Sequence, residues 1–177
     1  PTPTPTTTTS TTTTTSTTTT TSTITLPVAP VGVIEADVAV SSADPTVNFG
    51  TSPLLGADAS PVKHSFLRFR VTGVGLRTVA SAHLHLQVSN TVGSASVSGG
   101  RIHKISDCGW SELTMTSATQ PVIDGLVLAT AGAVAFDQVV DFDVTSAVPG
   151  DGVYCFALEN PGTDGVSYNS REATGQH

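Results

Sequence analysis

The sequence has few aromatic residues, few cationic residues and no long apolar run. Its 177 residues include one Trp, two Tyr and seven Lys plus Arg against fourteen Asp plus Glu, which gives a formal net charge of −7. An acidic chain without a basic stripe is unsuited to nucleic acid or to an anionic membrane surface. No apolar stretch approaches the roughly 20 residues that span a bilayer. We therefore expect neither nucleic-acid binding nor membrane insertion.

The common catalytic motifs are also missing. The chain has no G-x-S-x-G, no H-E-x-x-H and no P-loop sequence, which are the short motifs that mark hydrolase elbows, zinc peptidases and nucleotide sites. Function therefore has to be sought in binding or in structure, and we predict that the chain is not an enzyme.

Residues 1–23 are almost pure Thr, with Pro at positions 1, 3 and 5 and Ser at positions 10, 16 and 22. Such a tract has almost nothing apolar to bury, so we predict an extended stalk. Ser/Thr-rich tracts with Pro are typical of O-glycosylated stalks. The evenly spaced Ser residues lie along one edge in either extended geometry. The candidate O-glycosylation sites are Thr7, Ser10, Thr13, Ser16, Thr19 and Ser22.

The rest of the chain is long enough for one domain with a single core. We assign residues 24–33 to a connection or donor strand and residues 34–177 to the domain. The only two cysteines, Cys108 and Cys155, are predicted to form a disulfide, with two buried thiols as the alternative. The stalk, the low Lys count and the cysteine pair together indicate a secreted or cell-surface protein.

Short runs in the domain alternate apolar and polar residues, as half-buried strands do. Turn-forming clusters of Gly, Pro, Asn, Asp and Ser separate them, and no long amphipathic helix is indicated. The pattern predicts an all-β fold, an antiparallel sandwich of jelly-roll kind. The runs cover 34–40, 67–71, 82–88, 140–144 and 153–158, and the turn clusters cover 41–46, 57–61, 94–100, 149–152 and 160–165.

Six short motifs in a fixed order resemble the DNRLRE, or disaggregatase-related, domain family. They are 35–40 (EADVAV), 42–50 (SADPTVNFG), 65–69 (SFLRF), 110–112 (WSE), 141–145 (DFDVT) and 170–173 (SREA). The resemblance implies a secreted β-sandwich of the kind attached to polysaccharide-degrading enzymes or repeated in surface proteins. Some members resemble alginate-binding carbohydrate modules. It also implies that Arg171 and Glu172 make structural ion pairs, so that Glu112 and Glu172 are not a glycosidase pair.

The resemblance further implies a closing apolar strand after residues 170–173, whereas this sequence ends at His177. A sandwich without that strand has unpaired backbone groups beside exposed core. Residues Ile24, Leu26 and Val28 alternate with polar or Pro residues and are the candidate donor strand, supplied by a neighbouring copy through β-strand addition. The alternative is that this segment is the first strand of its own sheet.

Two further kinds of site were considered. Sugar binding needs exposed aromatic rings with planar hydrogen-bonding side chains, while a metal needs clustered His or carboxylate ligands. The sugar-binding candidates are Trp110, Tyr154, Tyr168, Arg68 and Arg70. His83, His85 and His103 are interpreted as polar surface, and no metal or cofactor site is predicted. Bound Ca²⁺ is retained only as an alternative, at Asp141 and Asp143 with Asp37 or Glu35.

The sequence analysis thus predicts a non-catalytic extracellular structural module, a subunit or repeat of a surface filament or adhesin-like assembly whose partners are other copies of the chain. The alternative function is a carbohydrate-binding module of a secreted polysaccharide-active enzyme, with a polysaccharide as partner. Because the domain is itself acidic, an anionic alginate ligand is disfavoured.

If the stalk carries O-glycans, the proteolytic peptide that contains residues 1–23 should exceed its sequence mass by a ladder of sugar units when isolated from the native source. No Asn-x-Ser/Thr acceptor occurs in the chain, so mild alkaline β-elimination should remove the whole ladder. Mass spectrometry before and after elimination measures this. A single unmodified mass from native material contradicts the prediction.

Overall fold

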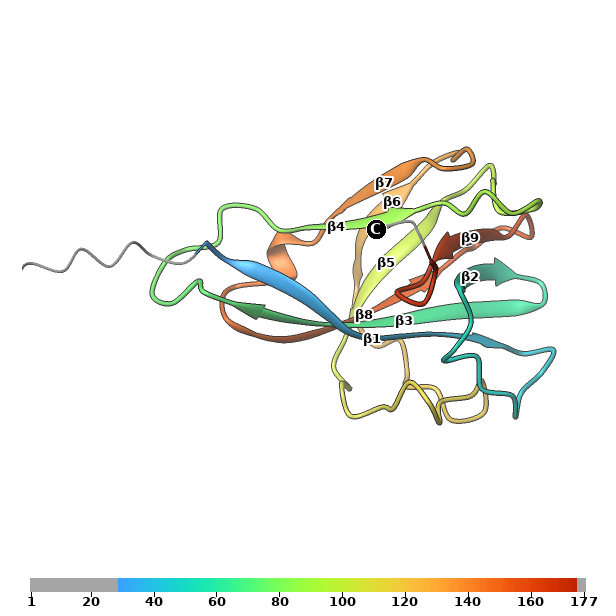
Figure 1. Ribbon diagram of the computed structural model, residues 1–177, viewed down its shortest axis with the longest axis horizontal. Helices are drawn as coiled ribbons and strands as arrows, with labels where there is room; N and C mark the ends of the chain where they lie inside the picture. Colours follow the sequence, from blue (N-terminus) through green and yellow to red (C-terminus); the bar gives the residue numbers. More distant parts are fainter. Residues whose placement is uncertain (1–28, 175–177) are drawn as a thin grey trace, which may run out of the picture.

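The computed structural model describes residues 29–174, which form nine β-strands and one short 3-10 helix (Figure 1). The stalk and the candidate donor residues Ile24, Leu26 and Val28 lie outside the described residues. The strands are β1 (Val31–Ser41), β2 (Leu54–Ala59), β3 (Val62–Thr72), β4 (His83–Gln87), β5 (Gly100–Ile105), β6 (Val127–Ala131), β7 (Val139–Asp143), β8 (Gly152–Glu159) and β9 (Val166–Asn169); the helix is η1 (Thr145–Ala147).

The predicted all-β antiparallel sandwich is confirmed, and each predicted alternating run falls in a strand, namely in β1, β3, β4, β7 or β8. β1 begins at Val31, inside the segment assigned to a connection. Four strands were not predicted: β2, β5, β6 and β9. β2 and β5 also extend into segments predicted as turns, 57–61 and 94–100. These strands are short and contain Gly, Ala or Ser, so pairing with neighbours decides their conformation more than local propensity does.

β3 is the centre of the larger sheet. It pairs antiparallel with β1 on one side and with β8 on the other, and the hydrogen-bonded order is β6-β5-β8-β3-β2-β9. β2 meets β3 only at their shared hairpin, through Asp58 and Ala59, whereas its earlier residues pair with β9. The β2–β9 pair therefore leaves the plane of the larger sheet.

β4 and β7 form the second layer, which lies above β3 and β8 in Figure 1. They pair antiparallel from His83 opposite Asp143 to Gln87 opposite Val139. An isolated bridge between Val88 and Tyr168 connects the end of β4 to β9. The second layer thus consists of β7 and β4, continued by β9 and β2.

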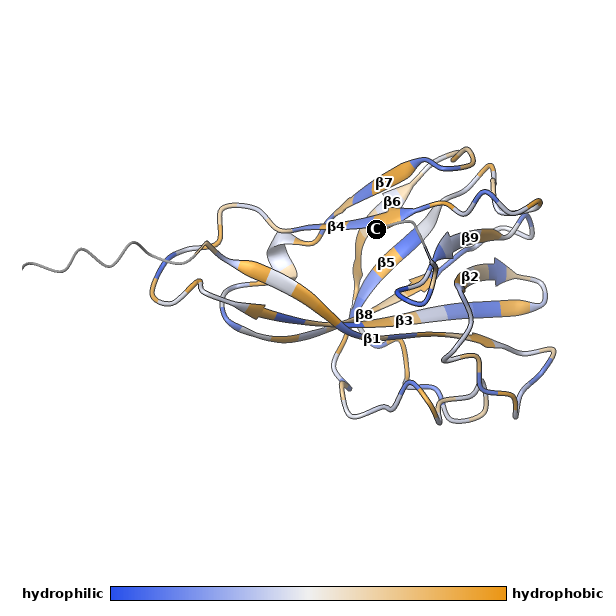
Figure 2. Cartoon of the chain, viewed as in Figure 1, coloured by the Kyte–Doolittle hydropathy of each residue, from blue (hydrophilic) through white to orange (hydrophobic). Residues whose placement is uncertain are grey.

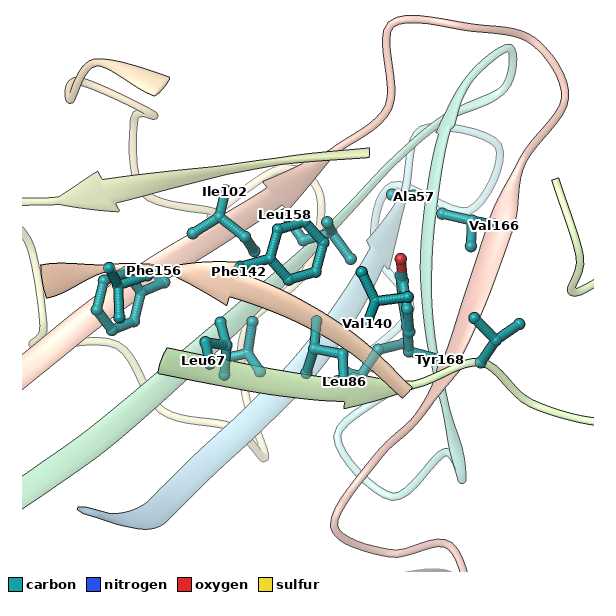
Figure 3. Packing of buried hydrophobic residues seen from close by; sticks show 14 of the residues in the cluster. Ala57, Leu67, Leu86, Ile102, Val140, Phe142, Phe156, Leu158, Val166 and Tyr168 are labelled. Atoms are coloured by element: carbon teal, nitrogen blue, oxygen red, sulfur yellow. The ribbon is translucent and has the colours of Figure 1, made fainter. Parts of the chain in front are cut away.

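The main core fills the space between the layers. Figure 2 shows hydrophobic and hydrophilic residues following one another along β3; the buried Leu67 belongs to the core beneath the β4–β7 pair, whereas Phe66 faces the other side of the sheet. Tyr154, Phe156 and Leu158 of β8 pack in the same core as Leu67, and Phe142 packs edge-on against Tyr168 (Figure 3). Alternation along a strand sends successive side chains to opposite faces, which leaves Cys155 for the other face of the sheet.

That other face is covered by the long connection between β5 and β6. Cys155 and Ala157 of β8 form a second buried cluster with Phe66, Trp110 and other residues. Cys108, in the connection, forms a disulfide with Cys155, at a sequence separation of 47 residues. In the loop-entropy model, a disulfide that closes a loop of this length stabilises the folded state by about 4 kcal/mol, because it restricts the unfolded chain. The disulfide predicted from the sequence is therefore present, and it fixes the connection to the sheet.

Candidate functional site

Two aromatic residues predicted to contact sugar lie in the interior. The Trp110 ring is 8% exposed, packs against Phe66 and has the Arg68 guanidinium 4.9 Å from its centroid. Tyr168 is fully buried, and its hydroxyl donates a hydrogen bond of 2.7 Å to the carbonyl of Gly99 (Figure 3). Burial raises the pKa of Tyr168. Neither ring is available to a surface ligand, because each points from its segment into a core.

The two arginines predicted to contact sugar have structural partners. Arg68 donates hydrogen bonds from Nη1 to the carbonyls of Cys108 and Trp110, at 3.1 and 2.8 Å, and so fastens the β5–β6 connection to β3. Arg70 donates from Nε to Glu35 Oε1 at 2.5 Å, in an ion pair on the outer surface. These positions do not converge with Tyr154 on one sugar site.

The three histidines do not assemble a metal site. His83 Nδ1 lies 2.7 Å from Asp141 Oδ1, and His85 Nε2 lies 3.7 Å from the same atom, on the exposed side of β4. His103 lies on another strand, where its Nε2 is 2.9 Å from Glu159 Oε1. Two histidines thus share one exposed carboxylate, and the third is separate from them.

The alternative Ca²⁺ set is likewise not brought together. Asp143 Oδ1 accepts a hydrogen bond from the backbone of Thr145, and hydrogen bonds from Thr145 lower the pKa of Asp143. Glu35 pairs with arginines on the outer surface, whereas Asp37 is buried in another cluster. In a regular strand Glu35 and Asp37, two positions apart, would share a face. The β1–β3 register is irregular between Ile34 and Ala36, so Glu35 points to the outer surface while Asp37 points inward.

A groove lies between β4 and the first part of β1. It consists of two cavities that adjoin at Phe69, which lines both of them. The first has a volume of about 400 Å³ and is lined mainly by apolar side chains, including Val71 and Tyr154. Tyr154 is thus the one predicted aromatic residue that reaches the groove, although its hydroxyl already donates to the carbonyl of Gly150.

The second cavity, of about 310 Å³, is the polar end of the groove. Its floor is apolar and includes Leu67 and Phe69, and its rim includes His85, Gln87 and Arg171. The sequence analysis did not single out Phe69 or Gln87 for this role. No local signal identifies them, because only the packing of β4 over β3 brings them to one surface.

From His83 to His85, the edge of β4 that borders the groove is not paired with any described strand, whereas near Val88 β4 bridges to Tyr168 of β9. The backbone groups of Ala82 and Val88 are hydrogen-bonded on the β7 side. Because backbone direction alternates along a strand, those of His83 and His85 point to the opposite edge, which borders the groove. The groove therefore combines an apolar floor with one wall of backbone donors and acceptors.

A buried ionic network closes the polar end of the groove. The backbone N–H of Asp37 and Nε of Arg171 both donate to Glu112 Oε1, each at 2.8 Å, and Arg171 Nη2 donates to Glu112 Oε2. The backbone N–H of Arg171 donates to Asp37 Oδ2 at 2.9 Å. A Cβ at Gly50 would lie 2.1 Å from the Glu112 carbonyl oxygen, so glycine is required for the chain to pass beside this network.

Glu172 completes the network, with its Oε1 at 3.0 Å from Arg171 Nε. The structural ion pairs predicted at Arg171 and Glu172 are thus present. Glu112 is held between Asp37 and Arg171 and does not line either cavity of the groove. The arrangement therefore fits a structural role for Glu112 and Glu172.

The described part of the chain is thus a β-sandwich with a groove on its surface. The chain matches the family model of carbohydrate-binding module family 96 over residues 33–177, and it belongs to that family. No curated protein matches the chain. The match supports the resemblance to carbohydrate-binding modules, which are a non-catalytic class, while the DNRLRE name remains a resemblance. Among residues 29–174, no helix is long and apolar enough to cross a membrane.

Burial makes the stability of the domain depend on pH through Asp37. Its burial, opposed in part by the hydrogen bond from the Arg171 backbone, raises its pKa to about 7 from 3.8. Between these two values the folded state binds more protons than the unfolded state, so the free energy of unfolding falls as pH rises from about 4 to about 7. With a chelator present, urea titrations across this range should show a decrease on the order of a few kcal/mol.

The Asp37→Asn variant should flatten this dependence, since the amide has no carboxyl proton to lose. Asp44, at an exposed turn, supplies the matched control: Asp44→Asn should keep the wild-type slope. Equal slopes for wild type and Asp37→Asn would show that the dependence comes from other groups.

Proposed function

We propose that the chain is a non-catalytic carbohydrate-binding module of a secreted protein and that the groove along β4 is its binding site. The observation that carries this proposal is the apolar floor at Phe69 below a polar rim that includes His85 and Gln87. Sugar rings bury their C–H faces on apolar or aromatic surface and pair their hydroxyls with side-chain amides, imidazoles and backbone groups. The unpaired edge of β4 adds backbone groups along the same wall.

A neutral polysaccharide fits this groove better than a uronate polymer. The cation at its polar end, Arg171, is already paired with Glu112 and Glu172, and Asp37 lines the same cavity. A carboxylated sugar would therefore meet a negative surface on a chain whose formal net charge is −7.

Secretion is part of the proposal. The Cys108–Cys155 disulfide indicates an oxidising environment, and carbohydrate-binding modules act on polysaccharides outside the cell or at its surface. A polyproline-II stalk of the length of residues 1–23 reaches about 70 Å. We propose that this stalk is a glycosylated spacer that holds the module away from the rest of the protein.

The binding site can be tested by a double substitution, His85→Ala with Gln87→Ala. The loss of these rim groups should weaken binding to the preferred neutral polysaccharide on a glycan array, and in calorimetry, by about 10-fold or more, because each lost hydrogen bond costs on the order of 1 kcal/mol. Thermal unfolding should be nearly unchanged.

The matched control is Gln120→Ala. Gln120 is also partly buried, but it hydrogen-bonds His64 beside the β5–β6 connection, away from the groove, and its loss should leave glycan affinity unchanged. Failure of the wild-type chain to bind any polysaccharide on the array contradicts the proposed function, and full binding by the double variant contradicts the proposed site.

A second candidate function is a subunit of a surface filament or adhesin-like assembly, joined by strand donation. The unpaired edge of β4 favours it, since such an edge accepts an added strand. His83 and His85 offer backbone groups there while their side chains are exposed. The donor strand of another copy would pair with β4 in parallel, with Ile24, Leu26 and Val28 facing the core. In that arrangement the backbone of Pro27 points to the edge away from β4, so its missing N–H removes no hydrogen bond to β4.

Strand donation predicts that Leu26→Asp abolishes self-association of the full chain, because it places an unpaired carboxylate among apolar side chains. Thr25→Asp is the matched control: its side chain faces away from the core in the same strand, so association should persist. Sedimentation velocity over a range of concentrations measures both. A wild-type chain that stays monomeric, or equal behaviour of the two variants, argues against donation.

A further inference from the structure

Three carboxylates from distant parts of the sequence meet at the polar end of the groove. Asp37 comes from β1, Glu112 from the β5–β6 connection and Glu172 from the segment after β9. One oxygen of each lies within 4.8 Å of the others. Oxygen ligands bind Ca²⁺ at about 2.3–2.6 Å, so oxygens on opposite sides of one ion are about 4.6–5.2 Å apart. The three groups are therefore close enough to share a single ion.

Two carboxylate oxygens of this cluster are buried and accept no hydrogen bond. Asp37 is 2% exposed, and its Oδ1 has no donor. Glu172 Oε2 is also buried without a donor. When both carboxylates are ionised, these two acceptors repel each other unless a cation lies between them, and an unsatisfied buried carboxylate oxygen is costly.

The charges of the cluster do not balance. Asp37, Glu112 and Glu172 contribute three negative charges when ionised, and Arg171 is the single cation that contacts them among the described residues. The guanidinium satisfies Glu112 but does not reach Asp37 Oδ1 or Glu172 Oε2. The remainder is two negative charges, which one divalent cation neutralises.

We propose that Asp37, Glu172 and Glu112 bind one Ca²⁺ ion. The donor set contains only oxygen, which favours a hard cation over Zn²⁺ or Cu²⁺. Ca²⁺ accepts irregular arrangements, whereas Mg²⁺ requires near-octahedral ligands at shorter distances. The site has three protein carboxylates, and the neighbouring guanidinium of Arg171 opposes a cation. We therefore expect weak Ca²⁺ binding, like that of extracellular modules, with a Kd of about 10⁻⁴–10⁻³ M.

Such an ion would join β1, the β5–β6 connection and the last turn of the chain. Asp37 and Arg171 also line the second cavity, so the ion would stabilise the polar end of the groove without contacting the apolar end. This inference is independent of sugar binding, and its test needs no polysaccharide.

The test is the melting temperature of the full chain at about pH 8, in Ca²⁺, in Mg²⁺ and in a chelator. At ten times Kd, Ca²⁺ should raise Tm by about 3–6 °C relative to the chelator. Glu172→Gln should abolish this shift, and Asp44→Asn, at an exposed turn, should retain it. Glu172 is half-buried, whereas Asp37 is fully buried. We therefore expect Glu172→Gln to fold even if Asp37→Asn does not.

A second measurement uses Tb³⁺ in place of Ca²⁺. Trp110, the only Trp in the chain, precedes Glu112 by two positions and should sensitise Tb³⁺ luminescence, which excess Ca²⁺ should quench and Glu172→Gln should remove. The proposal is overturned if Ca²⁺ leaves Tm unchanged, if Mg²⁺ raises it equally, or if the shift and the luminescence persist in Glu172→Gln. An unchanged Tm without luminescence would indicate a proton shared by Asp37 and Glu172.

Discussion

The fold depends on the contact between Glu112 and its two partners, the backbone of Asp37 and the guanidinium of Arg171. One carboxylate joins the first strand, the long β5–β6 connection and the segment after the last strand. Its side chain is 10% exposed, so its negative charge must be paired within the protein. Asn48 supports the same loop by donating to the carbonyls of Glu112 and Met115. Three segments that are far apart in sequence are held at one place by this network.

Burial of the larger sheet on both faces has a direct consequence for binding. β8 contributes Tyr154 and Phe156 to the core between the layers and Cys155 to the cluster under the β5–β6 connection. The chain has one Trp and two Tyr. Trp110 and Tyr168 are buried in the cores on the two faces of the larger sheet. A flat aromatic platform is therefore not formed from these residues; the ring of Phe69, which is partly buried, lines the groove instead.

The groove exists because the second layer is narrow. β4 pairs with β7 on one side only, and its bridge to β9 begins at Val88, so the floor formed by β3 is not covered along the whole of β4. Apolar surface beside unpaired backbone groups suits a polysaccharide, whose rings and hydroxyls match the two kinds of surface, and it equally suits an added strand. The two candidate functions thus use one physical feature and differ in the occupant.

The alternating runs determined the all-β class and five of the strands, because periodicity of two is a local property that a half-buried strand must show. The cysteine pair and the motifs with Trp110, Glu112 and Arg171 likewise indicated a disulfide and ion pairs. Only the tertiary structure decided which aromatic rings are exposed, since burial depends on what packs against each face. It also decided where Asp37, Glu112 and Glu172 meet and where β4 remains unpaired, because those relations join segments that no local pattern connects.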